Sequence, residues 1–344
     1  MKEFYGNPSS IHSLGRKSKN LIETARKSIA THFGVSSSEI IFTSSGTEAD
    51  NLILFNAVRN LGVQRIITSK IEHHAVLHCA EALQLEESIQ IDFVDVDDLG
   101  DINLNHLEEL LKDQTKKTLV SLMYINNEIG NMLPIQIVAQ MCKKYNALFH
   151  SDTVQAIGHY PIDLNEIQAD FIVGSAHKFH GPKGVGFAFF RNGFGISPMI
   201  HGGNQEKGAR SSTENLHSII GMEKALSLSL NSVNEDINYI NQLKEYCVKS
   251  FKELDSSIRF NGNSDKLSKS SCTILSISLP KELSMLLFQL DLKGIAVSGG
   301  SACQSGSNQG SHVLKELKKT SSPSTSIRIS FSKFTSKNEI DVLI

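Results

Sequence analysis

The sequence has 344 residues, 40% of them hydrophobic, and balances 34 lysines and arginines against 36 aspartates and glutamates. This length suffices for a large domain with a buried core plus a smaller one. No block of five or six like charges occurs, so a nucleic-acid surface, which depends on clustered lysine and arginine, is not expected. The first residues contain a charge pair and a turn, and no apolar run is long enough to span a bilayer. We therefore expect no membrane contact, and the odd number and wide spacing of the five cysteines fit a cytoplasmic protein.

The five cysteines are widely spaced and form no C-x-x-C motif, so neither a disulfide framework nor a zinc site is expected. Cys79, Cys142 and Cys247 lie in helical patterns and Cys272 opens a strand, which predicts small buried side chains. Cys303 differs because the surrounding stretch, 298–307, is rich in glycine and serine and cannot build a core. This composition predicts a mobile loop that gives a reactive thiol access to other molecules.

Helix and strand patterns alternate through the first two thirds of the chain. Apolar residues recur every fourth position from Leu21 to Phe33, which predicts one face of a helix. Further helices are expected from about 44 to 60, from 74 to 85, and from Pro134 onwards. The predicted strands are 40–43, 65–68, 89–93, 119–124, 147–150, 171–173 and 185–190. This alternation predicts an α/β fold with a mostly parallel central sheet and helices on both faces.

A second, smaller α+β unit is expected after residue 230. A polar stretch around 227–241 predicts one long helix leading into it, followed by strands at 273–278 and 327–331. The composition of 319–326 predicts a loop. We place the domains at 1–230 and 231–344.

Functional side chains follow several predicted strands, where ligands bind in open α/β sheets. The turn at Gly46 and Thr47 fits an anion-binding helix start, although plain helix capping also explains it. His73 and His74 are adjacent and therefore face different ways, so a surface or capping role competes with any functional one. Asn127 fits a turn.

Asp152 and Lys178 are the most informative single positions. A carboxylate at a buried strand end needs a partner, and a protonated ring nitrogen would serve, although helix capping is the alternative. Lys178 follows an apolar strand and precedes the glycine-rich stretch 181–186. This setting predicts a Schiff-base lysine, while an ordinary solvated lysine remains the alternative.

Taken in order, these motifs resemble the fold-type I enzymes that use pyridoxal 5′-phosphate (PLP). In closer detail they resemble cysteine desulfurases of the nitrogen-fixation and iron–sulfur type, within the class V aminotransferase family. The resemblance covers nearly the whole chain. The matching stretches are 5–12, 43–51, 72–73, 126–130, 152–155, 175–178, 181–184, 210–213, 298–303 and 326–328.

The resemblance implies a role for each matching residue. Lys178 would bind PLP, Asp152 would pair with the ring nitrogen, Gln155 would hydrogen-bond the phenolic oxygen, and His73 would stack on the ring and move protons. Arg328 would bind the substrate carboxylate, and Asn127 would contact that carboxylate or the ring oxygen. The phosphate would be held by Gly46, Thr47, Ser175 and His177, and by Thr213 of the neighbouring subunit, which implies a homodimer.

The implied reaction converts L-cysteine to alanine and leaves a persulfide on Cys303. An iron–sulfur scaffold or another acceptor protein would then receive the sulfur. The spacing from Cys303 to His312 is similar to that of the family's long-loop group. No resident metal is expected, although Cys303 could bind a cluster transiently.

The chain also departs from the family pattern. It lacks the usual N-terminal Y-L-D-x-x-A-T-T-P segment and the last C-terminal helix, and it has Ser212 where glycine is common. Other enzymes of the same superfamily, such as a selenocysteine lyase, are alternatives, although Cys303 argues against an aminotransferase. A scaffold-binding protein of impaired activity is a further alternative.

Overall fold

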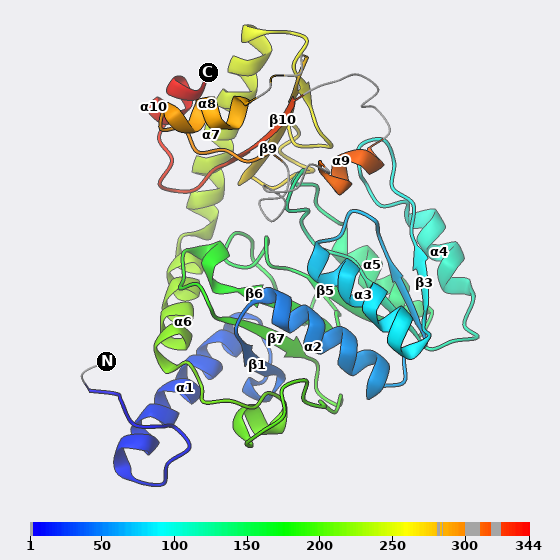
Figure 1. The fold of residues 1–344 in the computed structure, drawn as a ribbon, viewed down its shortest axis with the longest axis vertical. Coiled ribbons are helices and arrows are strands. Elements are labelled where there is room, and N and C mark those ends of the chain that lie inside the picture. Colours follow the sequence, from blue (N-terminus) through cyan, green and yellow to red (C-terminus); the bar gives the residue numbers. More distant parts are fainter. Residues whose placement is uncertain (1–2, 281–282, 284, 300–309, 318–324) are drawn as a thin grey trace.

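A seven-stranded sheet forms the centre of the larger part of the protein (Figure 1). The computed structural model describes residues 3–280, 283, 285–299, 310–317 and 325–344. The strands in spatial order are β1 (Ile40–Thr43), β7 (Gly186–Phe190), β6 (Phe171–Ser175), β5 (Leu148–Asp152), β4 (Thr118–Ser121), β2 (Arg65–Thr68) and β3 (Gln90–Phe93). Only β7 runs against its neighbours within this sheet, so the predicted mostly parallel sheet is confirmed.

Helices cover both faces of this sheet and bury its apolar side chains in two clusters. On one face lie α1 (Ser13–His32), α4 (Leu104–Lys112), α5 (Ile135–Lys144) and α6 (Leu216–Asn231). On the other lie α2 (Gly46–Arg59) and α3 (His74–Glu87). The three-layer α/β architecture follows from strands that are buried on both faces.

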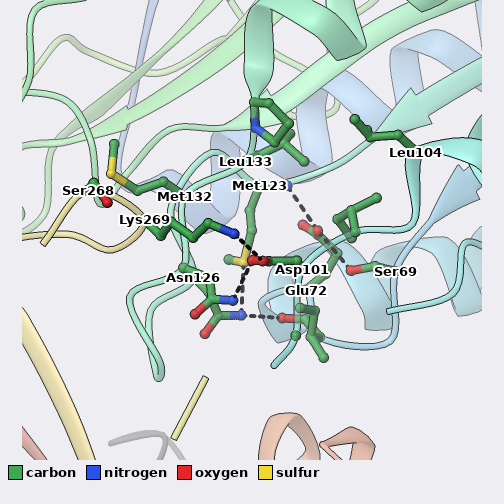
Figure 2. A pocket seen from close by; sticks show the side chains of 15 residues that line it. Ser69, Glu72, Asp101, Leu104, Met123, Asn126, Met132, Leu133, Ser268 and Lys269 are labelled. Atoms are coloured by element: carbon green, nitrogen blue, oxygen red, sulfur yellow. Dashed lines mark hydrogen bonds and ion pairs between the residues drawn. The ribbon is translucent and has the colours of Figure 1, made fainter. Parts of the chain in front are cut away.

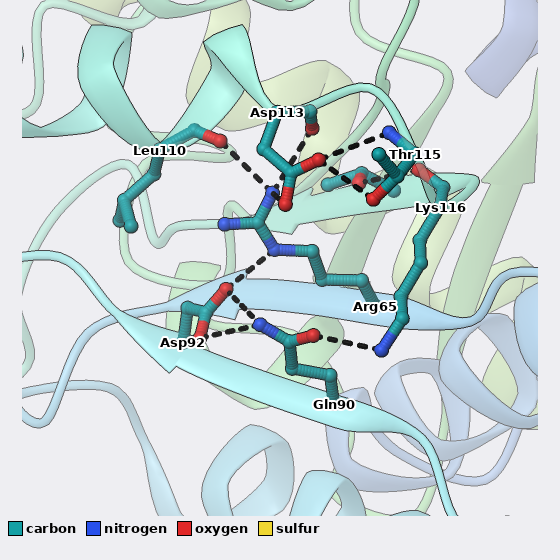
Figure 3. A network of polar contacts seen from close by, with 8 residues as sticks. Arg65, Gln90, Asp92, Leu110, Asp113, Thr115 and Lys116 are labelled. Atoms are coloured by element: carbon teal, nitrogen blue, oxygen red, sulfur yellow. Dashed lines mark hydrogen bonds and ion pairs between the residues drawn. The ribbon is translucent and has the colours of Figure 1, made fainter.

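A buried arginine at the amino end of β2, Arg65, forms a network of polar contacts (Figure 3). Arg65 forms an ion pair with Asp92 of β3 and donates to the backbone oxygens of Leu110 (2.9 Å) and Asp113 (3.1 Å). Asp92 also accepts from Gln90, which in turn accepts from Lys116 at 2.8 Å. These contacts lie at the opposite end of β2 from the turn that carries the predicted site residues.

The smaller part contains a three-stranded antiparallel sheet in the order β10 (Thr325–Ser330), β9 (Ile274–Leu279), β8 (Arg259–Phe260). It shares an apolar core with α7 (Val233–Leu254) and α10 (Lys337–Leu343). Two further short helices are α8 (Leu286–Leu292) and α9 (His312–Glu316), and single 3₁₀ turns are η1 (Ser37–Glu39), η2 (Ala176–Phe179) and η3 (Gln205–Gly208). Among the described residues, no helix is both long and apolar enough to cross a membrane.

Two sequence predictions need correction. The single helix expected around 227–241 is two helices, α6 and α7, separated at Ser232. Ser232 leaves the helical conformation and donates its hydroxyl to Asp236 at 2.8 Å, a local bond that competes with helix continuation. The strand predicted for 119–124 ends at Ser121, although the N–H groups of Leu122 and Tyr124 still donate to the backbone oxygens of His150 and Asp152 in β5. The domain limits at residue 230 stay a prediction.

Candidate active site

The carboxyl ends of five strands meet at one edge of the large sheet. Strands β2, β4, β5 and β6 are mutually parallel, and β1 points the same way because β7 is antiparallel to both β1 and β6. The turns that follow four of them, β1, β2, β5 and β6, and the chain beyond β4 carry most of the predicted site residues. The expectation that these turns share an edge is confirmed.

Gly46 begins α2 directly after the turn that follows β1, and Ser45 caps the helix by accepting from the Glu48 N–H at 3.1 Å. A Cβ atom at Gly46 would lie 2.8 Å from Val154 Cγ2 and 3.5 Å from Ser175 Cβ. A larger residue at position 46 would therefore force the Val154 side chain to shift. The same packing brings the helix start next to Ser175, so two predicted phosphate contacts are adjacent, while Thr47 is exposed.

Lys178 lies in the 3₁₀ turn η2, directly after β6. The hydroxyl of Ser175 lies 3.1 Å from Nδ1 of His177, and burial together with Lys178 and Lys183 lowers the pKa of His177. The Lys178 backbone oxygen accepts from Nε2 of His159 at 2.7 Å, which holds the turn in place. The turn thus presents a hydroxyl, an imidazole and an amine within four residues.

Asp152 ends β5 and is only 7% exposed. One carboxylate oxygen accepts from the Val154 N–H at 2.9 Å, in a turn and not at the start of a helix. Burial raises the pKa of Asp152, and the nearby His73, the Val154 N–H and Lys178 oppose that rise. A cation held against this carboxylate would keep it ionised, as expected from the cost of burying a lone charge.

A second layer of buried polar groups lies on the same strand face as Asp152. His150 precedes it by two residues, and its Nδ1 lies 2.8 Å from the Ser121 hydroxyl. Its Nε2 lies 3.4 Å from Oδ1 of Asp50 on α2. Burial lowers the pKa of His150 to about 3 and raises that of Asp50 well above its ordinary value. Burial thus disfavours the charged form of both groups, whereas the charge of Lys178 favours the ionised form of Asp152.

His73 caps α3, with Nδ1 accepting from the Ala75 N–H at 3.1 Å. The capping role considered for it is thus present, and the ring remains half-buried beside the site. The preceding Glu72 is buried, and its Oε1 accepts from the Met123 N–H (2.9 Å) and the Ser69 hydroxyl (3.2 Å). Burial raises the pKa of Glu72 to about 8.

Arg328 reaches from β10 of the smaller part to the turn after β4. Nη1 donates to the Asn127 backbone oxygen at 2.6 Å, and Nη2 donates to the Ser298 hydroxyl at 3.1 Å. Oδ1 of Asn127 is buried and has no hydrogen-bond partner among the described residues. The structure therefore brings the predicted residues Asn127 and Arg328 together, and Oδ1 of Asn127 is available to accept a hydrogen bond from a ligand.

Thr213, Gln155 and Cys303 are the remaining predicted positions. Thr213 is exposed and borders a cavity of about 190 Å³ together with Ser44 and Arg210. Gln155 is half-buried in the turn after Asp152. Cys303 lies outside the described residues, whereas Cys79, Cys142, Cys247 and Cys272 are all buried, as predicted.

A larger cavity of about 470 Å³ lies beside these turns (Figure 2). Figure 2 shows Glu72 between Met123 and Ser69, and Lys269 facing Asp101. Nζ of Lys269 lies 3.6 Å from Oδ2 of Asp101. None of the residues predicted to bind cofactor or substrate lines it. We assign this cavity no part in the chemistry.

Several site residues escaped the sequence prediction. Glu72 lies in the matching stretch 72–73 and His150 in a predicted strand, but the sequence does not indicate which residues these side chains contact. Asp50 follows a helix pattern that gives no sign of a buried acid. Alternation along β5 was the one signal present, because it places His150 and Asp152 on one face.

Comparison with known proteins agrees with this arrangement. The family model described as aminotransferase class-V matches residues 1–343. "Cysteine desulfurase IscS" of Dictyoglomus turgidum is 39% identical over 99% of this chain and 86% of its own length. "Putative cysteine desulfurase IscS 1" of Bacillus subtilis is 41% identical over 95% and 86%. A solved "NifS-like protein" superposes with a TM-score of 0.90 at 36% identity, covering 99% of this chain and 90% of that one. The chain therefore belongs to the class-V aminotransferase family and, within it, to the cysteine desulfurases of the IscS and NifS type.

Proposed function

We propose that this cysteine desulfurase binds PLP at Lys178 and that Cys303 receives the sulfur of L-cysteine. The observation that carries the cofactor assignment is the buried carboxylate of Asp152, which lies near the side chains of His73 and Lys178. The start of helix α2 at Gly46 and the adjacent Ser175 form a suitable binding site for a phosphate group. When bound, PLP supplies an electron sink for the substrate α-carbon.

The residues of the chain have separate tasks. The Lys178 amine holds the cofactor and then takes up the proton from the substrate α-carbon. With PLP bound, an ionised Asp152 would keep the ring nitrogen protonated, and Gln155 and Thr47 would add polar contacts to the ring oxygen and the phosphate. His73 would lie against the ring and move a proton. The Arg328 guanidinium, already oriented by Asn127 and Ser298, binds the substrate carboxylate in a two-point contact.

Sulfur transfer balances without an external oxidant. The thiolate of Cys303 attacks the substrate sulfur, so that an S–S bond forms while the bond from substrate Cβ to sulfur breaks. The electron pair of the broken bond stays on Cβ, which takes up a proton. Cysteine and one protein thiol thus give alanine and one protein persulfide.

We further propose a homodimer in which Thr213 reaches the phosphate in the neighbouring subunit, and an iron–sulfur scaffold or other protein as sulfur acceptor. The exposure of Thr213 and of Tyr5 (70%) and Ile11 (91%) supports an interface on this side of the chain. The dimer is tested by sedimentation measurements of molecular mass. A monomeric mass at micromolar protein concentration would contradict the proposed homodimer.

The central experiment compares the wild type with Cys303→Ala and Lys178→Ala. The wild type should show cofactor absorbance, release alanine and carry a persulfide on Cys303. Cys303→Ala should keep the absorbance and lose the persulfide, whereas Lys178→Ala should lose the lysine-bound absorbance. Sulfur release at the full rate from Cys303→Ala would overturn the proposal.

A further inference from the structure

Three acidic side chains are buried in the same region beneath the candidate site. Asp50, Glu72 and Asp152 are 1%, 1% and 7% exposed, and they belong to α2, to the turn after β2 and to the end of β5. Burial raises the pKa of Asp50, and negative charge at Asp152 and Glu72 raises it further. Three negative charges in one buried region are unfavourable, so the protons that these groups keep decide which of them is ionised.

The surroundings of Asp152 and Asp50 suit different charge states. Asp152 lies near His73 and Lys178, whose positive charge favours its ionised form. Asp50 instead places Oδ1 at 3.4 Å from Nε2 of His150. Neither of these two atoms has another hydrogen-bond partner among the described residues. A proton between them would therefore satisfy both atoms at once.

The other ring nitrogen of His150 is held by β4. Ser121 and His150 are opposite each other on the neighbouring strands β4 and β5, and Nδ1 of His150 lies 2.8 Å from the Ser121 hydroxyl oxygen. If Asp50 and His150 share one proton, the pair has no net charge and Nδ1 carries the hydrogen that Ser121 accepts. If Asp50 is ionised and the imidazole is neutral with its hydrogen on Nε2, the pair carries one negative charge and Nδ1 accepts from Ser121. The protonation of Nδ1 therefore distinguishes the two arrangements.

We propose that Asp50 and His150 share one proton, so that their pair is uncharged and the negative charge of this buried region resides on Asp152. The inference rests on the proposed function, since it assigns the Asp152 carboxylate to the ring nitrogen of PLP. Asp50 and His150 are positioning residues, because they act through Asp152 and touch neither cofactor nor substrate.

The task of His150 in this arrangement is to offer the Asp50 proton an acceptor other than Asp152. Without the imidazole, that proton would be attracted to the negative charge of Asp152, as in other coupled carboxyl pairs. Asp152 would then be partly neutralised, and the ring nitrogen would lose part of the charge that keeps it protonated. Glu72 does not compete for this proton, because its Oε1 already accepts from the Met123 N–H and the Ser69 hydroxyl.

The first test is nuclear magnetic resonance of full-length, cofactor-free protein labelled with ¹⁵N-histidine. The His150 signals are identified by their loss in His150→Phe. We expect a proton on Nδ1 that persists from about pH 6 to about pH 9, because no free histidine titration takes place in a buried pair of this kind. Asp50→Asn should keep this tautomer, since its amide can donate to Nε2. Asp291→Asn, at an exposed position of α8, is the matched control. A wild-type His150 without a proton on Nδ1 would overturn the inference.

The second test compares His150→Phe with the double variant His150→Phe/Asp50→Leu. The measured quantities are the dissociation constant of PLP and the protonation of its ring nitrogen, followed with ¹⁵N-labelled PLP. The single variant should bind PLP about tenfold more weakly and show less ring protonation, as expected for a shift of about one pKa unit at Asp152. The double variant should return to within about threefold of the wild type, because no carboxyl group remains to give Asp152 a proton.

A rescue of this kind separates charge from packing, since both variants lose the same imidazole and the same contact with Ser121. A single variant with wild-type affinity, or a double variant as weak as the single one, would overturn the inference. If His150→Phe does not fold, the tautomer in Asp50→Asn and in the wild type, with the signals assigned through the chain, still decides. A wild type that binds no PLP at Lys178 would instead overturn the proposed function and leave the cofactor-free result standing.

Discussion

Replacing Arg328 with lysine should weaken L-cysteine binding while leaving the cofactor in place. Arg328 uses one nitrogen for the Asn127 backbone oxygen at 2.6 Å and another for the Ser298 hydroxyl at 3.1 Å. A single ammonium cannot keep both bonds and also present a planar fork to a carboxylate. Losing one hydrogen bond to a charged group costs about 1.5–3 kcal/mol.

That loss corresponds to a rise in KM for L-cysteine of roughly 10- to 150-fold, at about 1.4 kcal/mol per factor of ten. The kcat value should change much less, because the carboxylate is bound in both the ground state and the transition state. Alanine formation is measured over a series of L-cysteine concentrations. Arg259→Lys is the control, because Arg259 is exposed on β8 of the same small sheet. An Arg328→Lys protein with normal cofactor absorbance and unchanged KM would refute the assignment.

Three predictions concern stability. The backbone of Ser212 has a φ of 110°, a conformation that favours glycine. Ser212→Gly should therefore raise the free energy of unfolding, measured by denaturant titration, by about 1 kcal/mol. A lower free energy of unfolding in this variant would contradict backbone strain at Ser212. Glu206→Gln should lower the free energy of unfolding by about 3–5 kcal/mol, because the buried Arg26 loses its bidentate partner, whose oxygens lie at 2.6 and 2.8 Å. A loss below about 0.5 kcal/mol would show that this ion pair contributes little to stability. Burial raises the pKa of Glu72 from 4.5 to about 8, so between these pH values the folded protein keeps a proton that the unfolded chain has lost, and stability falls as pH rises. Glu72→Gln should therefore raise Tm more at pH 8 than at pH 5, and an equal rise at both would show that Glu72 is ionised when folded.

Glu206 also shows how stability and function meet in this chain. Besides binding Arg26, its carboxylate accepts from the Phe42 N–H at 2.9 Å on β1. The segment that continues from it carries Arg210, which pairs with Glu48 at 2.8 Å, and then Thr213. The buried ion pair therefore fixes the start of the segment whose end we expect to reach a neighbouring subunit.

The pattern of apolar residues along the sequence is sufficient to predict much of the architecture. Alternation of helix and strand predicted the parallel sheet, because the apolar period of each segment reflects which face it buries. Most of the predicted site residues lie directly after strands, since parallel strands place their carboxyl ends at one edge. The four cysteines in regular elements were correctly predicted to be buried.

Only the tertiary structure decided which polar groups share a low-dielectric environment. The helix residue Asp50 meets His150 from a strand 100 positions away, Arg328 meets Asn127 across 201, and Ser311 meets Glu128 across 183. Sequence spacing carries no signal for such pairs, because the free energy of a buried charge depends on neighbours in space. The residue types at the site could thus be read along the chain, whereas their protonation and their anchors depend on how the chain folds.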